Sequence, residues 1–371
     1  MSNNKVKVGI IGCGIISSTY FKNARDMFGN YEIVACADID VERAKKKAEE
    51  YGLAKGCSVE ELLADPDITI VINLTIPFAH ADVSIQALEA GKHVYVEKPL
   101  AVTREDGAKM IKLAKERGLR IGCAPDTFLG GGIQTAIKLV RDGWIGDPIG
   151  ATGFMMGAGH EFWHPAPEFY YQHGGGPMFD MGPYYLTAMV ALLGPIERVT
   201  GSARISYPER TITSAPKYGQ KIKVEIPTNV VGIMEFKNGA IGTLFTSFDT
   251  RGGTTLPSIE IYGNLGTLVV PDPNTFGGVV KYHRTGPSEW ADIPLTHGFA
   301  DNARGIGVAD MAQAIIENRP HRVNGELAYH VLEAMHGFHD ASRDGKHYVM
   351  QSTCETPEPL PFGTSKLFFH A

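Results

Sequence analysis

The first third of the chain alternates short apolar runs with helical patterns, and this alternation limits the possible folds more than any other feature. The first apolar run, Val6–Ile11, ends in a glycine-rich turn that precedes a helical segment. Further apolar runs follow at residues 33–37, 68–74, 93–97 and 119–124. The run at 68–74 is apolar at nearly every position, as expected of a parallel strand that helices cover on both faces. The pattern predicts an α/β fold with a doubly wound parallel sheet.

After about residue 125 the alternation stops and long β-rich stretches take over. The dipeptide Asn238-Gly239 lies between two apolar runs and indicates a hairpin, which joins antiparallel strands. Helical patterns occur at residues 133–142, 177–193, 306–318 and 326–343. A chain of 371 residues exceeds the usual size of one hydrophobic core. We therefore predict a parallel-sheet domain at 1–124, an α+β domain with a large, mostly antiparallel sheet at 125–350, and an extended tail at 351–371.

The composition is that of an ordinary globular protein and argues against several classes of function. Apolar residues make up 43% of the chain, and the formal net charge of −6 offers no basic surface for nucleic acid. No apolar stretch reaches the ~20 residues that span a membrane, and the N-terminus lacks the pattern of a secretory signal. The five cysteines are scattered, as in reduced proteins of the cytoplasm. We expect a cytoplasmic protein without nucleic-acid or membrane partners.

The turn Gly12-Cys13-Gly14 lies between the first strand and the first helix, where dinucleotide-binding folds hold a pyrophosphate. Gly12 permits the tight turn, and Gly14 allows the backbone to approach the phosphates. Ile15 and Ile16 then lead into a helix N-terminus, whose N–H groups and dipole favour an anion. Asp38 ends the second strand, where a carboxylate binds ribose hydroxyls and repels a 2′-phosphate. We predict a Rossmann-type site for NAD rather than NADP; alternatively, Asp38 only caps the next helix.

Two further clusters carry polar groups at positions suited to catalysis. Glu97 and Lys98 end a parallel strand, at the edge where such sheets bind ligands, although in isolation a solvated ion pair is the simpler explanation. Asp180 and Tyr184 follow three successive glycines and are four residues apart, so one helix would place them on the same face. There they could bind a hydroxyl and transfer its proton. The alternative is a helix-capping aspartate and a tyrosine that packs in the core.

The loop at residues 159–171 mixes aromatic and hydrogen-bonding side chains, among them Trp163 and His164. Such a mixture suits a carbohydrate, whose faces stack on rings while its hydroxyls need polar partners. The histidines of the loop could instead bind a metal, but their spacing matches no standard site and we predict no metal. Packing or an oligomer contact is the other explanation for the loop. Asp126 and Thr127 follow the last parallel strand and are expected to line the same crevice.

Four motifs, taken in order, resemble those of the Gfo/Idh/MocA family, which includes glucose–fructose oxidoreductase and inositol dehydrogenase. The motifs are Gly12-x-Gly14, the segment Thr75-Ile-Pro77 with His80, Gly91-Lys-His-Val leading to Glu97-Lys98-Pro99, and three glycines followed by Asp180-x-Gly-x-Tyr184. The likeness runs from about residue 5 to residue 345. It implies that Thr75, Pro77, His80, Glu97 and Lys98 bind the cofactor and that Lys98 is catalytic.

One position departs from the family pattern. The usual proton-transfer residue is a histidine four residues after the aspartate, and this chain has Tyr184 there. The change argues against a specific assignment as an inositol dehydrogenase. Because an ordinary tyrosine has a pKa of about 10, we expect the ammonium of Lys98 to lie close to Tyr184 and favour its phenolate. Asp180 would orient the substrate hydroxyl.

The resemblance implies an NAD(H)-dependent oxidoreductase that transfers a hydride between the cofactor and a secondary alcohol or ketone of a sugar, sugar derivative or cyclic polyol. The expected substrate contacts are Lys98, Asp126, Thr127, Trp163, His164, Asp180 and Tyr184. Two other functions stay open: an NAD-dependent glycosidase that acts through transient oxidation, and a non-catalytic NAD-binding regulator. The family commonly forms homodimers or homotetramers through the sheet of the second domain, so we also expect a homo-oligomer.

Overall fold

The computed structural model describes residues 5–369 and divides into two compact units. The first contains the chain up to residue 131, residues 296–329 and the chain from residue 357. The second contains residues 132–295 and 330–356. The functional division at 1–124, 125–350 and 351–371 stays a prediction, and its outermost residues, 1–4 and 370–371, lie outside the described residues.

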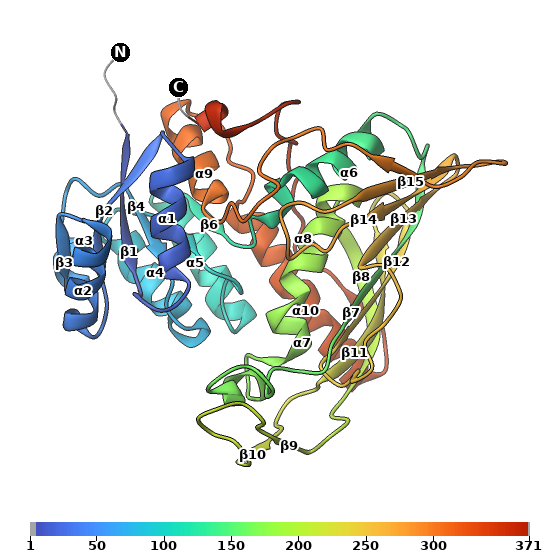
Figure 1. The fold of residues 1–371 in the computed structure, drawn as a ribbon, viewed down its shortest axis with the longest axis horizontal. Helices are drawn as coiled ribbons and strands as arrows, with labels where there is room; N and C mark the ends of the chain where they lie inside the picture. The colour runs from blue at the N-terminus through green and yellow to red at the C-terminus, as the bar shows by residue number, and fades with distance from the viewer. Residues whose placement is uncertain (1–4, 370–371) are drawn as a thin grey trace. The chain divides into compact units, whose positions relative to one another are not determined.

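The sheet of the first unit is parallel and has the strand order β3-β2-β1-β4-β5-β6 (Figure 1). Its strands are β1 (Val6–Ile11), β2 (Tyr31–Ala37), β3 (Lys55–Cys57), β4 (Ile70–Asn73), β5 (His93–Val96) and β6 (Ile121–Cys123). The strand order reverses between β1 and β4, so the carboxyl ends of these two strands form the switch point of the sheet. The predicted doubly wound sheet is confirmed. Strand β3 was not predicted from the sequence.

The helices of the first unit are α1 (Ser17–Met27), α2 (Val41–Tyr51), α3 (Val59–Leu63), α4 (His80–Glu89), α5 (Arg104–Glu116) and α9 (Ile306–Ile316), with the 3-10 helices η1 (Pro77–Ala79), η2 (Thr127–Leu129) and η4 (Lys366–Phe369). Three of them, α2, α3 and α5, begin at a residue whose side chain caps them through a short-range hydrogen bond. Asp40 caps α2, and Ser58 forms a capping box at α3, as the sequence predicts. The right-handed crossover rule places α1, which leads from β1 to β2, and α4, which leads from β4 to β5, on opposite faces.

The end of the chain packs on the first unit. Phe369 contacts the rings of Phe28 and Phe299, with centroids 5.9 and 5.8 Å away, and its carbonyl accepts a hydrogen bond from the N–H of Gly29. These contacts explain why the tail belongs to the same compact unit as β1.

The second unit contains a mixed sheet with the order β16-β15-β14-β13-β7-β12-β11-β8-β17. Its strands are β7 (Pro148–Met156), β8 (Ile196–Arg204), β11 (Asn229–Phe236), β12 (Ile241–Ser247), β13 (Ile259–Gly263), β14 (Gly266–Val270), β15 (Val280–Arg284), β16 (Ala291–Ile293) and β17 (Tyr348–Val349). Strands β7 and β12 pair in parallel, and the other neighbours pair antiparallel. The predicted large, mostly antiparallel sheet is confirmed, including the hairpin at Asn238-Gly239 between β11 and β12. A small separate ribbon joins β9 (Glu209–Thr211) and β10 (Lys221–Lys223).

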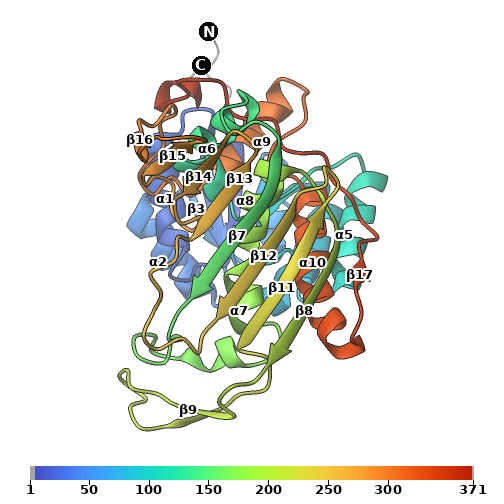
Figure 2. The ribbon, with the colours of Figure 1, turned by 90° about the vertical axis from the view of Figure 1, so that its right-hand side faces the viewer.

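Helices cover one face of the nine-stranded sheet. They are α6 (Gly131–Arg141), α7 (Gly176–Asp180), α8 (Gly182–Leu193) and the part of α10 (Gly325–Asp344) from residue 330, with the 3-10 helix η3 (Pro167–Tyr171) nearby. Every residue of α8 is buried, which makes it the centre of this core. Figure 2 shows the opposite face, on which strands β7, β12, β11 and β8 lie without a covering helix. Among residues 5–369, we find no helix with the length and apolar character needed to cross a membrane.

Candidate active site

A cavity of about 640 Å³ lies at the switch point of the parallel sheet. Gly12, Asp38 and Thr75, at the carboxyl ends of β1, β2 and β4, line it. Two further lining residues, Ile39 and Ile76, are 97% and 68% exposed. Doubly wound sheets bind their ligands at this place, and exposed aliphatic side chains beside a polar turn suit a ligand that carries flat rings.

The two glycines of the turn have different surroundings: Gly12 packs against the protein backbone, and Gly14 faces the cavity. Gly12 has φ +100°, and a Cβ there would lie 2.7 Å from the backbone carbon and oxygen of Leu74. A Cβ on Gly14 would meet no atom within 4 Å. Ser17, which replaces a third glycine, is buried and donates a hydrogen bond to the carbonyl of Gly14 at 2.7 Å. Helix α1 starts without a side-chain cap, while Ile15 at its entry is 89% exposed, so the helix N-terminus is available to an anion.

Asp38 fixes the cavity wall at the end of β2. Its carboxylate accepts hydrogen bonds from the N–H of Cys13 at 2.8 Å and of Asp40 at 2.9 Å. The guanidinium of Arg43, which also lines the cavity, approaches it to 3.4 Å. Asp38 therefore ties the glycine turn to the second strand, and the cap of α2 is supplied by Asp40 instead.

A buried network of hydrogen bonds holds the loop after β4. This network was not predicted from the sequence. Asn73 accepts hydrogen bonds from the N–H and hydroxyl of Thr75, and its amide donates to the carbonyl of His80 at 3.0 Å. The ring nitrogens of His80 lie 2.7 Å from the carbonyl oxygen of Pro99 and 3.1 Å from that of Thr75. Burial lowers the pKa of His80, and its contacts with the two backbone carbonyls act in the opposite direction. Through these contacts the ring joins the loops after β4 and β5. Pro77 begins η1 within this loop.

The Glu97-Lys98 segment is attached to the glycine-turn helix. The carboxylate of Glu97 accepts hydrogen bonds from the hydroxyl of Tyr20 at 3.0 Å and from the backbone N–H of Lys98 at 2.9 Å. Tyr20 lies on α1, and its burial raises its pKa well above the usual value, so it remains a donor. Lys98 is half-buried. Glu97 thus couples the backbone at Lys98 to the helix that begins at the glycine turn.

Asp126 and Thr127 are both buried in the first unit. The carboxylate of Asp126 accepts hydrogen bonds from the N–H groups of Gly305 and Gly307, at 2.9 and 3.1 Å, where α9 begins. Burial raises its pKa, and these hydrogen bonds act in the opposite direction. Asp126 therefore caps α9, and its expected contact with substrate stays a prediction, as does that of Thr127.

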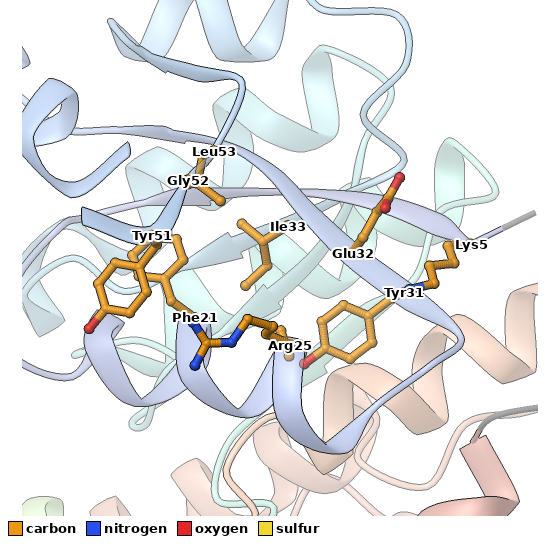
Figure 3. Close-up of a pocket in the computed structure, with 10 residues that line it drawn as sticks. Lys5, Phe21, Arg25, Tyr31, Glu32, Ile33, Tyr51, Gly52 and Leu53 are labelled. Atoms are coloured by element: carbon orange, nitrogen blue, oxygen red, sulfur yellow. The ribbon is translucent and has the colours of Figure 1, made fainter. Parts of the chain in front are cut away.

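A smaller cavity of about 230 Å³ lies elsewhere in the first unit (Figure 3). The rings of Phe21 and Tyr51 stack beside it at 4.8 Å, and Arg25 and Glu32 point along its walls. It includes Lys5, which precedes β1, so it lies toward the amino ends of the strands. Ligands of parallel sheets bind at the carboxyl ends, and this cavity is therefore separate from the dinucleotide site.

Asp180 and Tyr184 lie on two helices of the second unit rather than on one. The sequence predicted a helix within residues 177–193 that ends at Gly194, and α8 confirms it, but Met181, with φ −111°, separates α8 from α7. The expectation that one helix places Asp180 and Tyr184 on the same face is therefore wrong. The side chain of Asp180 is 16% exposed and lies 3.2 Å from the Nε2 atom of His160. Tyr184 is in the first turn of α8 and is 6% exposed.

The aromatic loop forms a cluster of rings around His160. Trp163 donates from its indole N–H to the Nδ1 atom of His160 at 3.2 Å, and half of Trp163 is exposed. His164 accepts a hydrogen bond from the N–H of Ala166 at its own Nδ1 atom, and burial lowers its pKa. Within the part of the chain that the structure describes, no three His, Cys, Asp or Glu side chains form a metal-binding group.

Three residues with evident roles at these sites, Tyr20, Arg43 and Asn73, were missed from the sequence, and His160 was considered only as a possible metal ligand. Asn73 gave the clearest signal, because a polar residue in an otherwise apolar buried strand needs hydrogen-bond partners. The partners of Tyr20 and His160 are 77 and 20 residues away, so no local pattern reveals them. Within the first unit the structure brings Gly12, Asp38 and Thr75 to one cavity.

The strand order, the glycine turn and the cavity at the switch point define a dinucleotide-binding α/β protein. The chain belongs to the Gfo/Idh/MocA oxidoreductase family. The family model described as "Oxidoreductase family, NAD-binding Rossmann fold" matches residues 6–124, and that of the "GFO/IDH/MocA C-terminal domain" matches residues 133–269.

Individual relatives are distant. A 1,5-anhydro-D-fructose reductase of Ensifer adhaerens is 29% identical over 273 residues, which cover 70% of this chain and 74% of that protein. A levoglucosan dehydrogenase of Pseudarthrobacter phenanthrenivorans is 26% identical over 250 residues, 63% of each chain. The crystal structure of an NAD binding oxidoreductase from Klebsiella pneumoniae covers 94% of this chain and all of its own, with a TM-score of 0.83 at 22% identity, which shows the shared fold.

Proposed function

We propose that the protein transfers a hydride between NAD(H) and a secondary alcohol or ketone of a sugar, sugar derivative or cyclic polyol. One observation carries the proposal: the glycine turn, the carboxylate of Asp38 and the loop at Thr75 meet at one cavity, in a chain whose two halves both match an oxidoreductase family. The substrate class is supported by the relatives named for an anhydrofructose and for levoglucosan.

The residues at the cavity fit NAD. The open space beside Gly14 accommodates a pyrophosphate against the backbone, and the negative charge of Asp38 disfavours the 2′-phosphate of NADP. Bound NAD supplies the carbon that accepts or donates the hydride. We assign Ile15, Ile16, Pro77 and Glu97 to the same site and give His80 an indirect role, since both its ring nitrogens contact backbone carbonyls.

Proton transfer is assigned to the side chains of Lys98, Asp180 and Tyr184. During oxidation, the phenolate oxygen of Tyr184 takes the proton of the substrate hydroxyl, while the ammonium of Lys98 favours the phenolate and polarises the substrate oxygen. Asp180 accepts a hydrogen bond from a substrate hydroxyl and so orients the substrate. Trp163 and His164 are assigned to stacking and hydrogen bonding with the sugar.

Steady-state kinetics with two variants test these roles, after a screen of monosaccharides, inositols and anhydrosugars by NADH absorbance. Lys98→Ala should abolish turnover while NAD binding, measured by quenching of protein fluorescence, persists. Tyr184→Phe should lower kcat by about 100-fold or more with little change in KM. Tyr185→Phe is the matched control: Tyr185 follows on the same helix, and its hydroxyl contacts the carbonyl of Phe154 at 3.3 Å.

Three results would contradict the proposal. Turnover close to wild type in Lys98→Ala would remove that lysine from the reaction. Release of sugar from an aryl glycoside without net NADH would indicate a glycosidase instead. If no sugar or polyol reduces bound NAD, a regulatory role is favoured.

We further propose that two or four copies assemble through the uncovered face of the nine-stranded sheet. Val231, Phe245 and Phe154 form one row across this face. Ile233 lies in the next row and Ile241 in the row after it, and they are 46% and 56% exposed. Antiparallel sheets that face water usually carry polar side chains, whereas contiguous apolar patches mark interfaces. The buried free thiols of all five cysteines agree with a cytoplasmic location.

Sedimentation equilibrium measures the assembly. Ile233→Glu should shift the protein towards the monomer, because a carboxylate would be desolvated at the interface. Ile316→Glu, on α9 of the first unit and 53% exposed, is the control and should leave the mass unchanged. A wild-type protein that is monomeric at micromolar concentration would contradict the proposal.

A further inference from the structure

His160 is held from several directions in the loop between β7 and η3. Its ring lies 3.9 Å from the ring of Tyr170 and 4.6 Å from that of Phe248, centroid to centroid. Its backbone N–H donates to the hydroxyl of Tyr171 at 3.1 Å. The side chain is 15% exposed. A ring fixed on its face, its edge and its backbone has little freedom to turn.

The two ring nitrogens of His160 have different partners, and these partners define the tautomer. An indole N–H can only donate, so the nitrogen that faces Trp163, Nδ1, must carry a lone pair. In the neutral ring the proton is then on Nε2, which lies 3.2 Å from the Oδ2 atom of Asp180. The chain of hydrogen bonds therefore runs from Trp163 to His160 and from His160 to Asp180.

A buried ionic cluster anchors the backbone of this loop. The guanidinium of Arg210, on β9, is almost fully buried and lies 3.4 Å from Glu161 and 3.3 Å from Asp249. It donates to the hydroxyl of Tyr171 at 2.9 Å, and that hydroxyl in turn donates to Glu161. Tyr171 itself packs in a small apolar core with Ile212, Ile222, Val224 and Phe248. Glu161 follows His160 directly, so the cluster fixes the backbone that carries the imidazole.

We propose that His160 is a positioning residue for the reaction, and that its Nε2–H holds the carboxylate of Asp180 ionised and correctly oriented to accept a hydrogen bond from the substrate. The inference rests on the proposed function, in which Asp180 orients the substrate hydroxyl. A hydrogen bond donated to a carboxylate favours its charged form, and partners of this kind fix the orientation of the groups they support. The chain has no histidine four residues after Asp180, and this arrangement supplies an imidazole from a different segment.

The charged and titratable groups around His160 come from three segments. Asp180 approaches from α7, and Tyr170 and Tyr171 from η3. His164 belongs to the same loop, and Glu161 faces Arg210. Of these, Asp180 is the acidic side chain that contacts the imidazole, which makes it the group through which His160 acts.

Nitrogen-15 NMR of the histidine-labelled full-length protein without substrate tests the tautomer directly. The signal that disappears in His160→Gln identifies His160. We expect a protonated Nε2 and an unprotonated Nδ1 at neutral pH, and a weakened but not reversed preference in Trp163→Phe, which removes the indole donor while Asp180 still accepts the Nε2–H. A proton on Nδ1 in the wild-type protein would overturn the proposal.

Kinetics of two substitutions at His160 separate positioning from simple packing. His160→Phe keeps an aromatic ring on Tyr170 but removes the donor, and kcat should fall about 10- to 100-fold. His160→Gln can place an amide N–H near the position of Nε2 and should recover most of that loss. Phe162→Leu, at an exposed position in the same loop, is the control and should behave as wild type.

The two measurements fail in different ways. Equal activity of His160→Phe and wild type, or no recovery in His160→Gln while His160→Phe is impaired, overturns the positioning role even if the enzyme oxidises sugars. If no sugar or polyol is a substrate, the proposed function fails, whereas the NMR result still decides whether His160 donates to Asp180.

Discussion

Gly12 and Gly14 are two residues apart, yet they serve the turn in different ways. The backbone of Gly12 is left-handed and presses against Leu74, so its glycine is required by the fold. Gly14 faces open space, and the protein alone would accept a side chain there. The two glycines look equivalent in the sequence motif, but Gly12 is required by the fold and Gly14 leaves space for the ligand.

Alanine substitutions should separate these two roles. Gly12→Ala should lower the free energy of unfolding by at least ~1–3 kcal/mol, because a non-glycine residue is strained at this φ and its Cβ meets the backbone of Leu74. Gly14→Ala should leave the Tm unchanged but weaken NAD binding about tenfold or more, since the methyl group occupies the space expected for the pyrophosphate. Thermal melts with and without NAD measure both effects. Unchanged NAD affinity in Gly14→Ala would show that the pyrophosphate binds elsewhere.

Residues whose partners are close in sequence could be predicted, and others could not. Asp40 and Ser58 cap helices through N–H groups three residues away, so the motif contains the whole interaction. The pair His160 and Asp180 depends on how a loop folds back on α7. The expected contact of Asp126 with substrate stays a prediction, whereas its hydrogen bonds to N–H groups at the start of α9, about 180 residues later, could not be predicted from the sequence.

At the scale of elements, the break between α7 and α8 places Asp180 at the end of one helix and Tyr184 at the start of the next. The helix expected within residues 177–193 begins only at Gly182, after a break at Met181, and the apolar pattern continues across the break, so periodicity could not reveal it. Strand β7 was also missed although it lies in the middle of the large sheet. It contains Gly150 and Gly153. A Cβ on Gly153 would lie 3.1 Å from Leu244, so the neighbouring strand packs closely here. Glycines therefore take the place of the β-branched residues that usually indicate a strand in a sequence.

Gly175 provides a test of the contact between η3 and α7. A Cβ at this position would lie 2.5 Å from the carbonyl oxygen of Phe169 and 2.9 Å from that of Tyr170, which are backbone atoms and cannot turn aside. Gly175→Ala should therefore lower the free energy of unfolding by ~1–3 kcal/mol in urea denaturation. Gly157→Ala, where a Cβ meets nothing within 4 Å, is the control and should be neutral. Equal stability of the two variants would mean that η3 can move away from α7.

At the scale of the whole molecule, the chain builds two units from five segments. The sequence predicted both sheets, because each depends on repeated local patterns. It did not predict that residues 296–329 and the tail return to the first unit. That return depends on contacts such as those of Phe369 with Phe28, across more than 300 residues, which no local pattern encodes.

Both units contain histidines that burial keeps neutral, and this makes stability dependent on pH. His93 in the first unit and His330 and His339 in the second each have a pKa lowered to about 4, with burial as the largest cause. In the unfolded chain a histidine titrates near 6.5. Between these values the unfolded state binds protons that the folded state does not. The free energy of unfolding should therefore be highest above pH 6.5 and fall as the pH drops towards 4, by about 1.4 kcal/mol per pH unit for each proton taken up.

Urea denaturation at pH 7.5, 6.5, 5.5 and 5.0 measures this slope above the range in which most carboxylates titrate. His339→Phe keeps a flat ring against Phe179, whose centroid is 5.9 Å away, but removes the titration. Its slope should therefore be smaller than that of the wild type by the contribution of one proton. His347→Gln removes an exposed histidine and should retain the wild-type slope. A free energy of unfolding that stays constant from pH 7.5 to 5.0 would mean that these rings titrate at the same pH in the folded and the unfolded chain, as rings in contact with water do.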